Sequence, residues 1–175
     1  PGRNHGQGAK WRRAEAERIT AELRKLLSAR DPAPSVAAMA QSGVLARILP
    51  GADPRVLAPL VHLDQADLPR WLRRLAVLGG ETEHLRLSRS EARDLAALRA
   101  ALGSADTSAA LGWRLGEPLA TDALLARAAS LGTPPPADWR AQGARGEASG
   151  FPGAAGGPPR PAPGRSWPRP WAGLC

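Results

Sequence analysis

Apolar residues along most of this chain recur every three or four positions, which is the spacing of one face of an α-helix. In the first such stretch the apolar positions are Ile19, Leu23, Leu26 and Leu27. They predict a helix over about residues 15–29. Asp31-Pro32 should end this helix, because the residue before a proline avoids helical geometry.

Helix-start signals separate the later apolar stretches. Asp53-Pro54 and Asp67-Leu68-Pro69 each place a carboxylate, which can cap a helix, just before a proline, which suits the first helical turn. Ser88 and Glu91 have the spacing of a capping box, in which each side chain binds the other residue's backbone N–H. Gly79-Gly80 follows an apolar run and is typical of a helix end. These signals predict several short helices joined by short loops.

Composition favours helices over strands. Alanine and leucine dominate the hydrophobic residues, which make up 43% of the chain, while tyrosine is absent and phenylalanine occurs once. Alanine and leucine are good helix formers, whereas strands prefer β-branched and aromatic residues. We therefore predict an all-α fold, a compact multi-helix array. No sequence repeats at a fixed period, so a solenoid is not expected.

The two ends differ in composition from the middle of the chain. Residues 150–175 contain 13 prolines and glycines among 26 positions and no acidic residue, so we expect a disordered tail. Residues 1–14 are basic and glycine-rich, and we expect an irregular end. The helical domain should span residues 15–149. Trp167 and Trp171, set among prolines, leave open a proline-rich partner motif in the tail.

Positive charge is concentrated at the ends. The formal net charge is +8, but residues 15–149 hold 17 basic and 16 acidic residues. A positive excess points to nucleic acid, because lysine and arginine neutralise phosphates and release counterions. A basic face on the helical domain must therefore come from the arrangement of its charges, since its net charge does not supply one.

Cysteine usage and hydropathy indicate a compartment. The single cysteine, Cys175, is the last residue, so neither a disulfide framework nor a cysteine-based metal site is expected. No apolar run approaches the roughly 18 residues that span a bilayer, and the first residues lack the apolar core of a signal peptide. We expect a cytoplasmic protein without a membrane partner.

The sequence offers no recognisable catalytic or metal site. His5, His62 and His84 lie far apart and have no zinc-ligand spacing around them. Glu81 and Glu83 fall in a predicted interhelical segment, where capping and solvation explain them. Glycine-rich phosphate loops and the GxSxG nucleophile motif are absent. A Ser-His-Asp arrangement assembled in space stays open, although nothing local favours it.

Basic residues on the polar faces of the predicted helices are the remaining candidates for function. They can bind RNA phosphates, or they can form an ordinary solvated surface paired with nearby carboxylates. Trp71 and Trp113 fall at helical spacing and are expected in the core rather than as platforms for base stacking. These basic residues are Arg18, Arg24, Lys25, Arg30, Arg70, Arg73, Arg74, Arg86, Arg89, Arg93 and Arg99.

Five segments of the chain are informative together. They are AERITAELRKLL from Ala16, MAQSGVLARILPGAD from Met39, WLRRLAVL from Trp71, LRLSRSEARDLAAL from Leu85 and WRLGEPLATDALLARAA from Trp113. In order and spacing they resemble the C-terminal half of bacterial CCA-adding tRNA nucleotidyltransferases and poly(A) polymerases. The first is the most specific of the five. The resemblance covers about residues 15–151.

The resemblance implies an RNA-binding helical part without its catalytic head. In this family a head and neck precede a helical body and tail that hold tRNA during processing of its 3′ end. The head's Gly-Gly-Arg stretch and paired metal-binding aspartates, and the neck's Glu-Asp-xx-Arg motif, have no counterpart in residues 1–14. Mg²⁺, CTP and ATP are therefore expected only on the missing head. The chain alone should be inactive and should contact the tRNA backbone by shape and phosphate recognition. The candidate RNA-binding residues for these contacts are Arg18, Arg24, Lys25, Arg73, Arg74, Arg86 and Arg89.

Both ends depart from the family pattern. Glu15 stands where the family usually has a serine cap, and the helical pattern stops after Phe151-Pro152. We hypothesise a truncated or frameshifted product, in which the face of Ile19 and Leu23 leaves an exposed apolar patch where the neck would pack. Two alternatives stay open. One is a helical protein-interaction or scaffold module with no RNA role, and the other is a nucleotidyltransferase fragment that needs a head from another chain.

Overall fold

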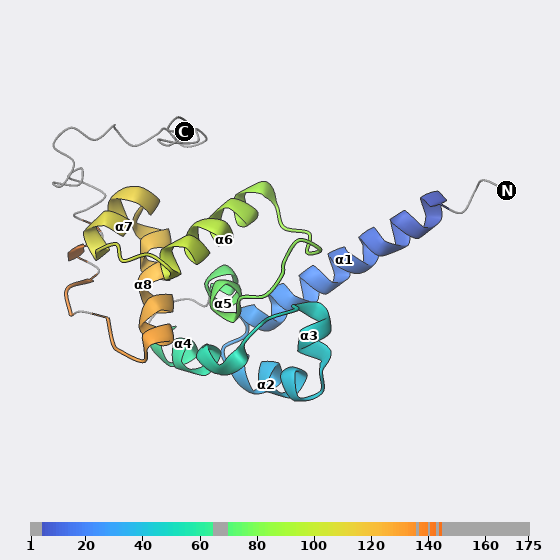
Figure 1. Cartoon of the computed structure of the whole chain (residues 1–175), viewed down its shortest axis with the longest axis horizontal. Coiled ribbons are helices and arrows are strands. Elements are labelled where there is room, and N and C mark those ends of the chain that lie inside the picture. Colours follow the sequence, from blue (N-terminus) through green and yellow to red (C-terminus); the bar gives the residue numbers. More distant parts are fainter. Residues whose placement is uncertain (1–4, 65–69, 136, 140, 143, 145–175) are drawn as a thin grey trace, which may run out of the picture.

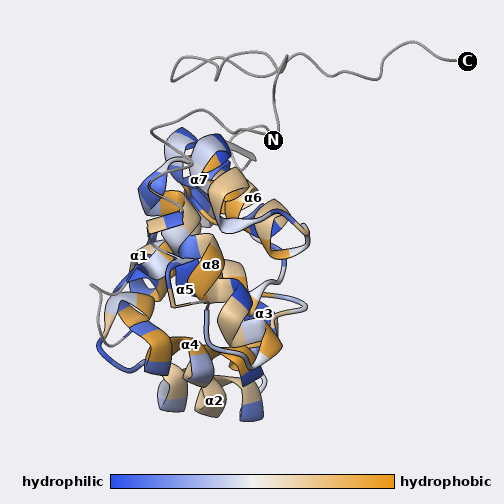
Figure 2. Ribbon diagram, turned by 90° about the vertical axis from the view of Figure 1, so that its left-hand side faces the viewer, coloured by the Kyte–Doolittle hydropathy of each residue, from blue (hydrophilic) through white to orange (hydrophobic). Residues whose placement is uncertain are grey.

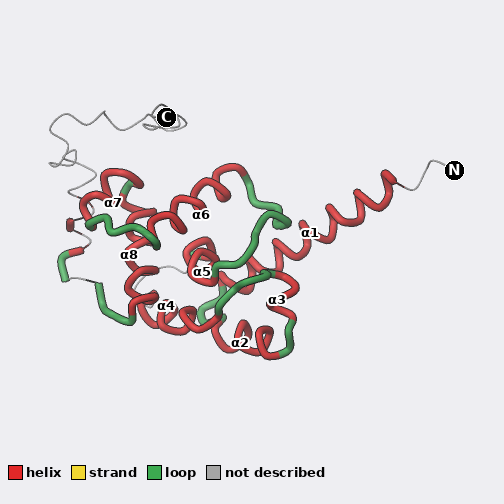
Figure 3. The backbone as a smooth tube through the Cα atoms, viewed as in Figure 1, coloured by secondary structure: helices red, strands yellow, loops and turns green. Residues whose placement is uncertain are grey.

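The computed structural model describes residues 5–64, 70–135, 137–139, 141–142 and 144, which form an all-α array (Figure 1). Its helices are α1 (His5–Ser28), α2 (Ala33–Gln41), α3 (Val44–Ile48), the 3-10 helix η1 (Pro54–Val56), α4 (Leu57–Leu63), α5 (Trp71–Leu78), α6 (Arg89–Leu102), α7 (Ser108–Leu115) and α8 (Glu117–Leu131). No strand occurs in this part of the chain (Figure 3). The predicted fold class is therefore confirmed, while the tail predicted over residues 150–175 lies outside the described residues.

α8 is the central helix of the array. It packs against α4, α5, α6 and α7, and its buried positions lie all around its axis. Many of them are alanines, namely Ala120, Ala123, Ala126, Ala128 and Ala129. Small side chains let neighbouring helices approach closely, and a helix that is apolar on all sides is stable only when it is enclosed. The outer helices instead alternate hydrophobic and hydrophilic stretches along their length (Figure 2).

α1 begins earlier than predicted. The helix starts at His5 rather than near residue 15, so the expected irregular end is wrong for residues 5–14. Its first half extends away from the body of the molecule (Figure 1). Alanine and long straight side chains dominate Ala14–Leu27, and a helix once nucleated there propagates at little cost per residue. No helix in the described part of the chain is long and apolar enough to cross a bilayer.

The apolar face of α1 is covered by this chain itself. Leu23 and Leu27 are buried in the core, and Ile19 is half-buried against it. The exposed apolar patch expected at Ile19 and Leu23 is therefore absent. The large hydrophobic side chains that are exposed in the described residues are Val44 and Leu131, the latter 73% exposed.

Two of the predicted caps are present. Glu91 N–H donates to Ser88 Oγ at 3.2 Å and Ser88 N–H donates to Glu91 Oε2 at 2.8 Å, which completes the capping box at the start of α6. Asp53 caps η1 by accepting the Arg55 N–H at 3.0 Å. The cap predicted at Asp67 lies outside the described residues.

The loop after α5 packs tightly against the loop between α3 and η1. Glu81 N–H donates to the Pro50 carbonyl at 2.8 Å, and Asp53 N–H donates to the Leu78 carbonyl at 2.8 Å. Gly80 has a φ of +76°, and a Cβ there would lie 2.9 Å from the Pro50 carbonyl oxygen. Both the dihedral angle and the close approach therefore require glycine at this position.

Candidate nucleic-acid-binding surface

Five of the seven predicted residues are exposed. Arg18, Arg24 and Lys25 lie on α1, while Arg86 and Arg89 lie just before and at the start of α6. Of these five, only Arg24 forms an ion pair within the described residues. The other four side chains keep their charge available to a ligand.

The predicted exposure of Arg73 and Arg74 is wrong. Both side chains are 1% exposed and lie among α1, α4 and α8, so neither can reach a ligand in this fold. Arg73 Nη1 donates to Asp122 Oδ1 at 2.9 Å, and Arg74 Nε donates to Asp64 Oδ2 at 3.0 Å. Arg73 Nη2 also lies 2.6 Å from Asp64 Oδ1, a close charge contact without hydrogen-bond alignment.

These charges form a buried chain of alternating sign. Arg70, whose side chain is 43% exposed, closes one end with Nε 3.1 Å from Asp122 Oδ2. Burial raises the pKa of Asp122 to about 6, although the attraction of Arg73 and Arg70 opposes this shift. Arg74 closes the other end, where it donates to the carbonyl oxygens of residues 27, 29 and 30 at the end of α1. A cation at this negative end of the helix dipole favours α1 ending where it does.

Two further arginines, Arg99 and Arg127, also donate to backbone carbonyls at helix ends. Arg99 Nη2 donates to the carbonyls of Gly79 and Gly80 at 3.0 and 2.9 Å, at the end of α5. Arg127 donates to the carbonyl of Ala101 in the last turn of α6 and to that of Asp106 in the loop that follows. Burial lowers the pKa of both guanidinium groups. Sequence reasoning missed these roles because the carbonyls that accept the bonds leave no trace in residue type.

Two hydrogen-bonded contacts, called fastenings below, hold the segment from Arg86 to Glu91 against α1. Arg86 N–H donates to the buried Thr20 Oγ1 at 2.9 Å. Arg24 Nη2 donates to Glu91 Oε1 at 2.7 Å, and the Arg24 guanidinium lies 4.8 Å from the centre of the Trp71 ring. Trp71 is half-buried against the core, as predicted. α1 and the start of α6 therefore form one composite surface.

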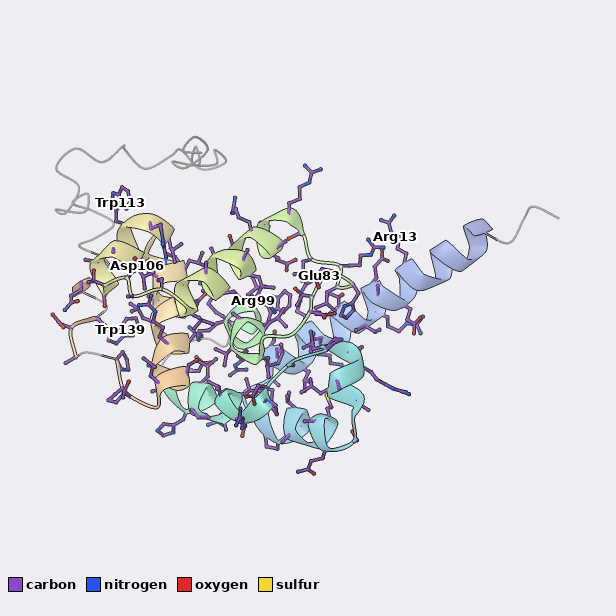
Figure 4. The ribbon with its side chains drawn as sticks, in the orientation of Figure 1. Arg13, Glu83, Arg99, Asp106, Trp113 and Trp139 are labelled. Carbon is purple, nitrogen blue, oxygen red and sulfur yellow. The ribbon has the colours of Figure 1, made fainter. Side chains whose placement is uncertain are left out.

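Positive charge is uneven over this surface. Residues 15 and 22 are exposed glutamates on the same side of α1 as Arg18 and Lys25, because helical neighbours three or four positions apart share a face. Beside Arg86 and Arg89, Glu91 is already engaged by Arg24 and by the capping box, while Glu83 in the preceding loop is exposed. Figure 4 shows Arg13 standing above α1 and Glu83 in the neighbouring loop between α5 and α6. Arg13 is paired with Glu17 at 3.1 Å.

Two further arginines that are exposed and form no ion pair in the described residues lie outside the seven predicted RNA-binding residues. Arg30 follows the end of α1 and Arg47 lies on α3, and neither side chain forms an ion pair within the described residues. No group of three or more metal-ligating side chains occurs in the described part of the chain.

An apolar groove lies apart from the basic surface, between α2 and α4. Its volume is about 580 Å³, and its floor is made by small apolar side chains. The lining residues are Asp31, Ala33, Pro34, Ala37, Pro54, Arg55, Ala58, Val61 and His62. Arg55, one of these lining residues, already donates to both carboxylate oxygens of Asp53, so the groove has little free charge to offer a phosphate.

Comparison with known proteins gives one match. Residues 11–55, about a quarter of the chain, match the family described as a probable RNA- and SrmB-binding site of polymerase A. The matched segment contains α1 beyond its first residues, α2, α3 and most of η1. No curated protein and no solved structure is significantly similar to the chain. The match supports an RNA-binding role for the part of the molecule that carries Arg18, Arg24 and Lys25.

Proposed function

We propose that this chain binds structured RNA through the basic surface made by α1 and the start of α6, as the RNA-binding part of a CCA-adding tRNA nucleotidyltransferase or poly(A) polymerase. The observation that carries the proposal is the coincidence of two findings. Residues 11–55 match an RNA-binding family, and exposed cations without ion-pair partners lie on the same helix and beside it.

Phosphate recognition is the mode of binding that these side chains favour. Arg18, Lys25, Arg86 and Arg89 can each neutralise a backbone phosphate and release its counterion. The tryptophans with described side chains do not favour stacking on bases. Trp71 is engaged by Arg24, Trp139 is buried, and Trp113 has interactions within the chain. These side chains therefore favour recognition of RNA shape and phosphate positions, as in the tRNA acceptor and T-arm, over recognition of unpaired bases.

The proposal gives the chain a part in tRNA 3′-end processing without nucleotidyl transfer of its own. Nucleotidyl transfer needs carboxylates that hold Mg²⁺ against the transferring phosphates. The resemblance assigns those groups to a head that would act as the partner of this chain. Addition of such a head, with CTP and ATP as substrates, tests this finer part of the proposal by nucleotide incorporation.

Titration of the full chain with a tRNA transcript at about 50 and about 200 mM salt tests the binding. Arg86→Gln/Arg89→Gln should weaken binding and reduce the slope of log affinity against log salt by roughly 0.7–0.9 for each lost phosphate contact. The matched control is Arg55→Gln/Arg93→Gln, which removes the same charge from two arginines already paired with Asp53 and Asp94. Equal binding by both double variants would refute this surface.

The apolar groove favours a second candidate function, a protein-interaction module. Small side chains on α2 and α4 leave room for an apolar stripe of a partner. Its binding would depend little on salt, and it would respond to Ala37→Glu rather than to Arg89→Gln. The tRNA titration separates the two functions, because Arg55, the arginine among the groove's lining side chains, is already paired with Asp53.

A further inference from the structure

The backbone that carries Arg86 and Arg89 is held by α1 through a buried hydroxyl. Thr20 Oγ1 accepts the Arg86 N–H at 2.9 Å while its own hydroxyl donates to the Ala16 carbonyl at 2.7 Å. Thr20 is buried in the apolar face of α1, where a hydroxyl is costly unless it is hydrogen-bonded. Both of its bonding roles are therefore used, one within α1 and one to the segment that precedes α6.

A second fastening lies one helical turn further along α1. Glu91 uses Oε1 to accept Arg24 Nη2 at 2.7 Å and Oε2 to accept the Ser88 N–H at 2.8 Å. One carboxylate thus joins α1 to the first turn of α6. Trp71 supports the Arg24 guanidinium from below the surface, at 4.8 Å from its ring centre. The Arg24 side chain stays 44% exposed, but Glu91 already compensates its charge.

We propose that Thr20 and Arg24 are positioning residues of the RNA site. They fix the segment from Arg86 to Glu91 against α1, so that the guanidinium groups of Arg86 and Arg89 project from a backbone set before RNA arrives. This inference rests on the proposed RNA binding and assigns Arg24 a role through that segment instead of direct phosphate contact. Fixing a ligand-binding segment in advance strengthens binding, because less conformational entropy is lost on association.

Thr20→Val gives the cleanest test, because it removes the acceptor of the Arg86 N–H without changing any charge. Positioning predicts a roughly two- to tenfold weaker affinity for the tRNA transcript, with an unchanged salt slope because the phosphate contacts stay the same in number. Amide hydrogen exchange over residues 85–91 should become faster in the variant. Arg89→Gln should instead lower the salt slope and leave that exchange unchanged.

Glu91→Gln separates positioning from simple electrostatics by the sign of its effect. Glutamine at this place still completes a capping box, but the charged bond to Arg24 is lost. Removing a negative charge beside a polyanion strengthens binding if charge alone matters. If Glu91 instead acts by holding the Arg86–Glu91 segment in position, the variant should bind the tRNA transcript roughly two- to threefold more weakly. The matched control is Asp94→Asn, which also removes a negative charge on α6, breaks the exposed pair with Arg93 and leaves both fastenings intact.

The outcomes distinguish this inference from the function on which it rests. Wild-type binding that weakens with salt, with Thr20→Val and Glu91→Gln both weaker at constant slope, supports the positioning role. The same wild-type behaviour with Thr20→Val unchanged, or with Glu91→Gln tighter, overturns it and leaves RNA binding in place. Absence of salt-dependent wild-type binding overturns both. Should Thr20→Val fail to fold, as seen by circular dichroism, the Glu91→Gln result decides alone.

Discussion

Asp122→Asn should leave the protein at least as stable as the wild type at neutral pH, although it removes a buried ion-pair partner. Two effects oppose each other at this carboxylate. Arg73 at 2.9 Å and Arg70 at 3.1 Å favour its charge, while 1% exposure takes that charge out of water. The rise of its pKa from 3.8 to about 6 means that burial wins.

The pKa shift sets both the sign and the size of the expected effect. A folded-state pKa above the unfolded value means that the native state binds the proton more tightly, so this group favours folding below about pH 4. That contribution is lost as pH rises through about 6, and it amounts to roughly 3 kcal/mol at about 1.36 kcal/mol per pKa unit. An asparagine oxygen can still accept from Arg73, and Arg70 can turn to water. We therefore expect a change in unfolding free energy between zero and about 3 kcal/mol in the stabilising direction.

Urea unfolding followed by circular dichroism between pH 4 and pH 8 measures this difference. The wild type should lose stability relative to Asp122→Asn as pH rises from about 4 to about 6, and the two curves should then run parallel. Subtracting the variant cancels the titration of the other groups. The matched control, Asp94→Asn, breaks an exposed pair and should change stability by less than about 1 kcal/mol. Destabilisation of Asp122→Asn by more than about 2 kcal/mol at pH 7.5 would show that the attraction of the arginines outweighs burial, and would refute the reasoning.

Three further substitutions test other parts of the fold by urea unfolding. Arg74→Met should destabilise by about 3–5 kcal/mol, because it leaves Asp64 short of a partner in the core and removes the cation at the end of α1; a loss below about 1 kcal/mol contradicts this. Ser88→Ala should cost about 1 kcal/mol by removing half of the capping box, and an unchanged midpoint speaks against that cap. Gly80→Ala should cost more than about 1 kcal/mol, since its φ and the Pro50 carbonyl both exclude a Cβ; wild-type stability would contradict it.

Local pattern was sufficient to predict the helices. Apolar spacing placed Leu23 and Leu27 in the core, and the spacing of Ser88 and Glu91 predicted a capping box that the structure contains. These features depend on residues within one or two helical turns of each other, so that neighbours in sequence determine them. The early start of α1 was missed because its first residues carry no apolar stripe.

Tertiary contacts determine whether an arginine is buried or exposed, and the local sequence pattern does not reveal those contacts. Asp122 lies 49 positions from Arg73, so the pair that buries both cannot be predicted from helix spacing. One signal was nevertheless present. α5 has large or apolar side chains on nearly every side, with Trp71, Leu72 and Leu75 among them, and a helix enclosed in this way carries its charged residues into the core.

The near-neutral charge of the helical domain is compatible with a basic surface because its arginines are used in different ways. Arg99 and Arg127 donate to backbone carbonyls at helix ends, where no acidic residue is needed, and Arg74 does so in addition to its pair with Asp64. Others are compensated by carboxylates, as Arg24 is by Glu91. Among the described cations left without either kind of partner, Arg18 and Lys25 lie on α1, and Arg86 and Arg89 lie at the start of α6, next to the two fastenings. Arg30 and Arg47, after the end of α1 and on α3, are free as well. Which arginines stay free, rather than how many there are, therefore decides whether this domain can hold a polyanion.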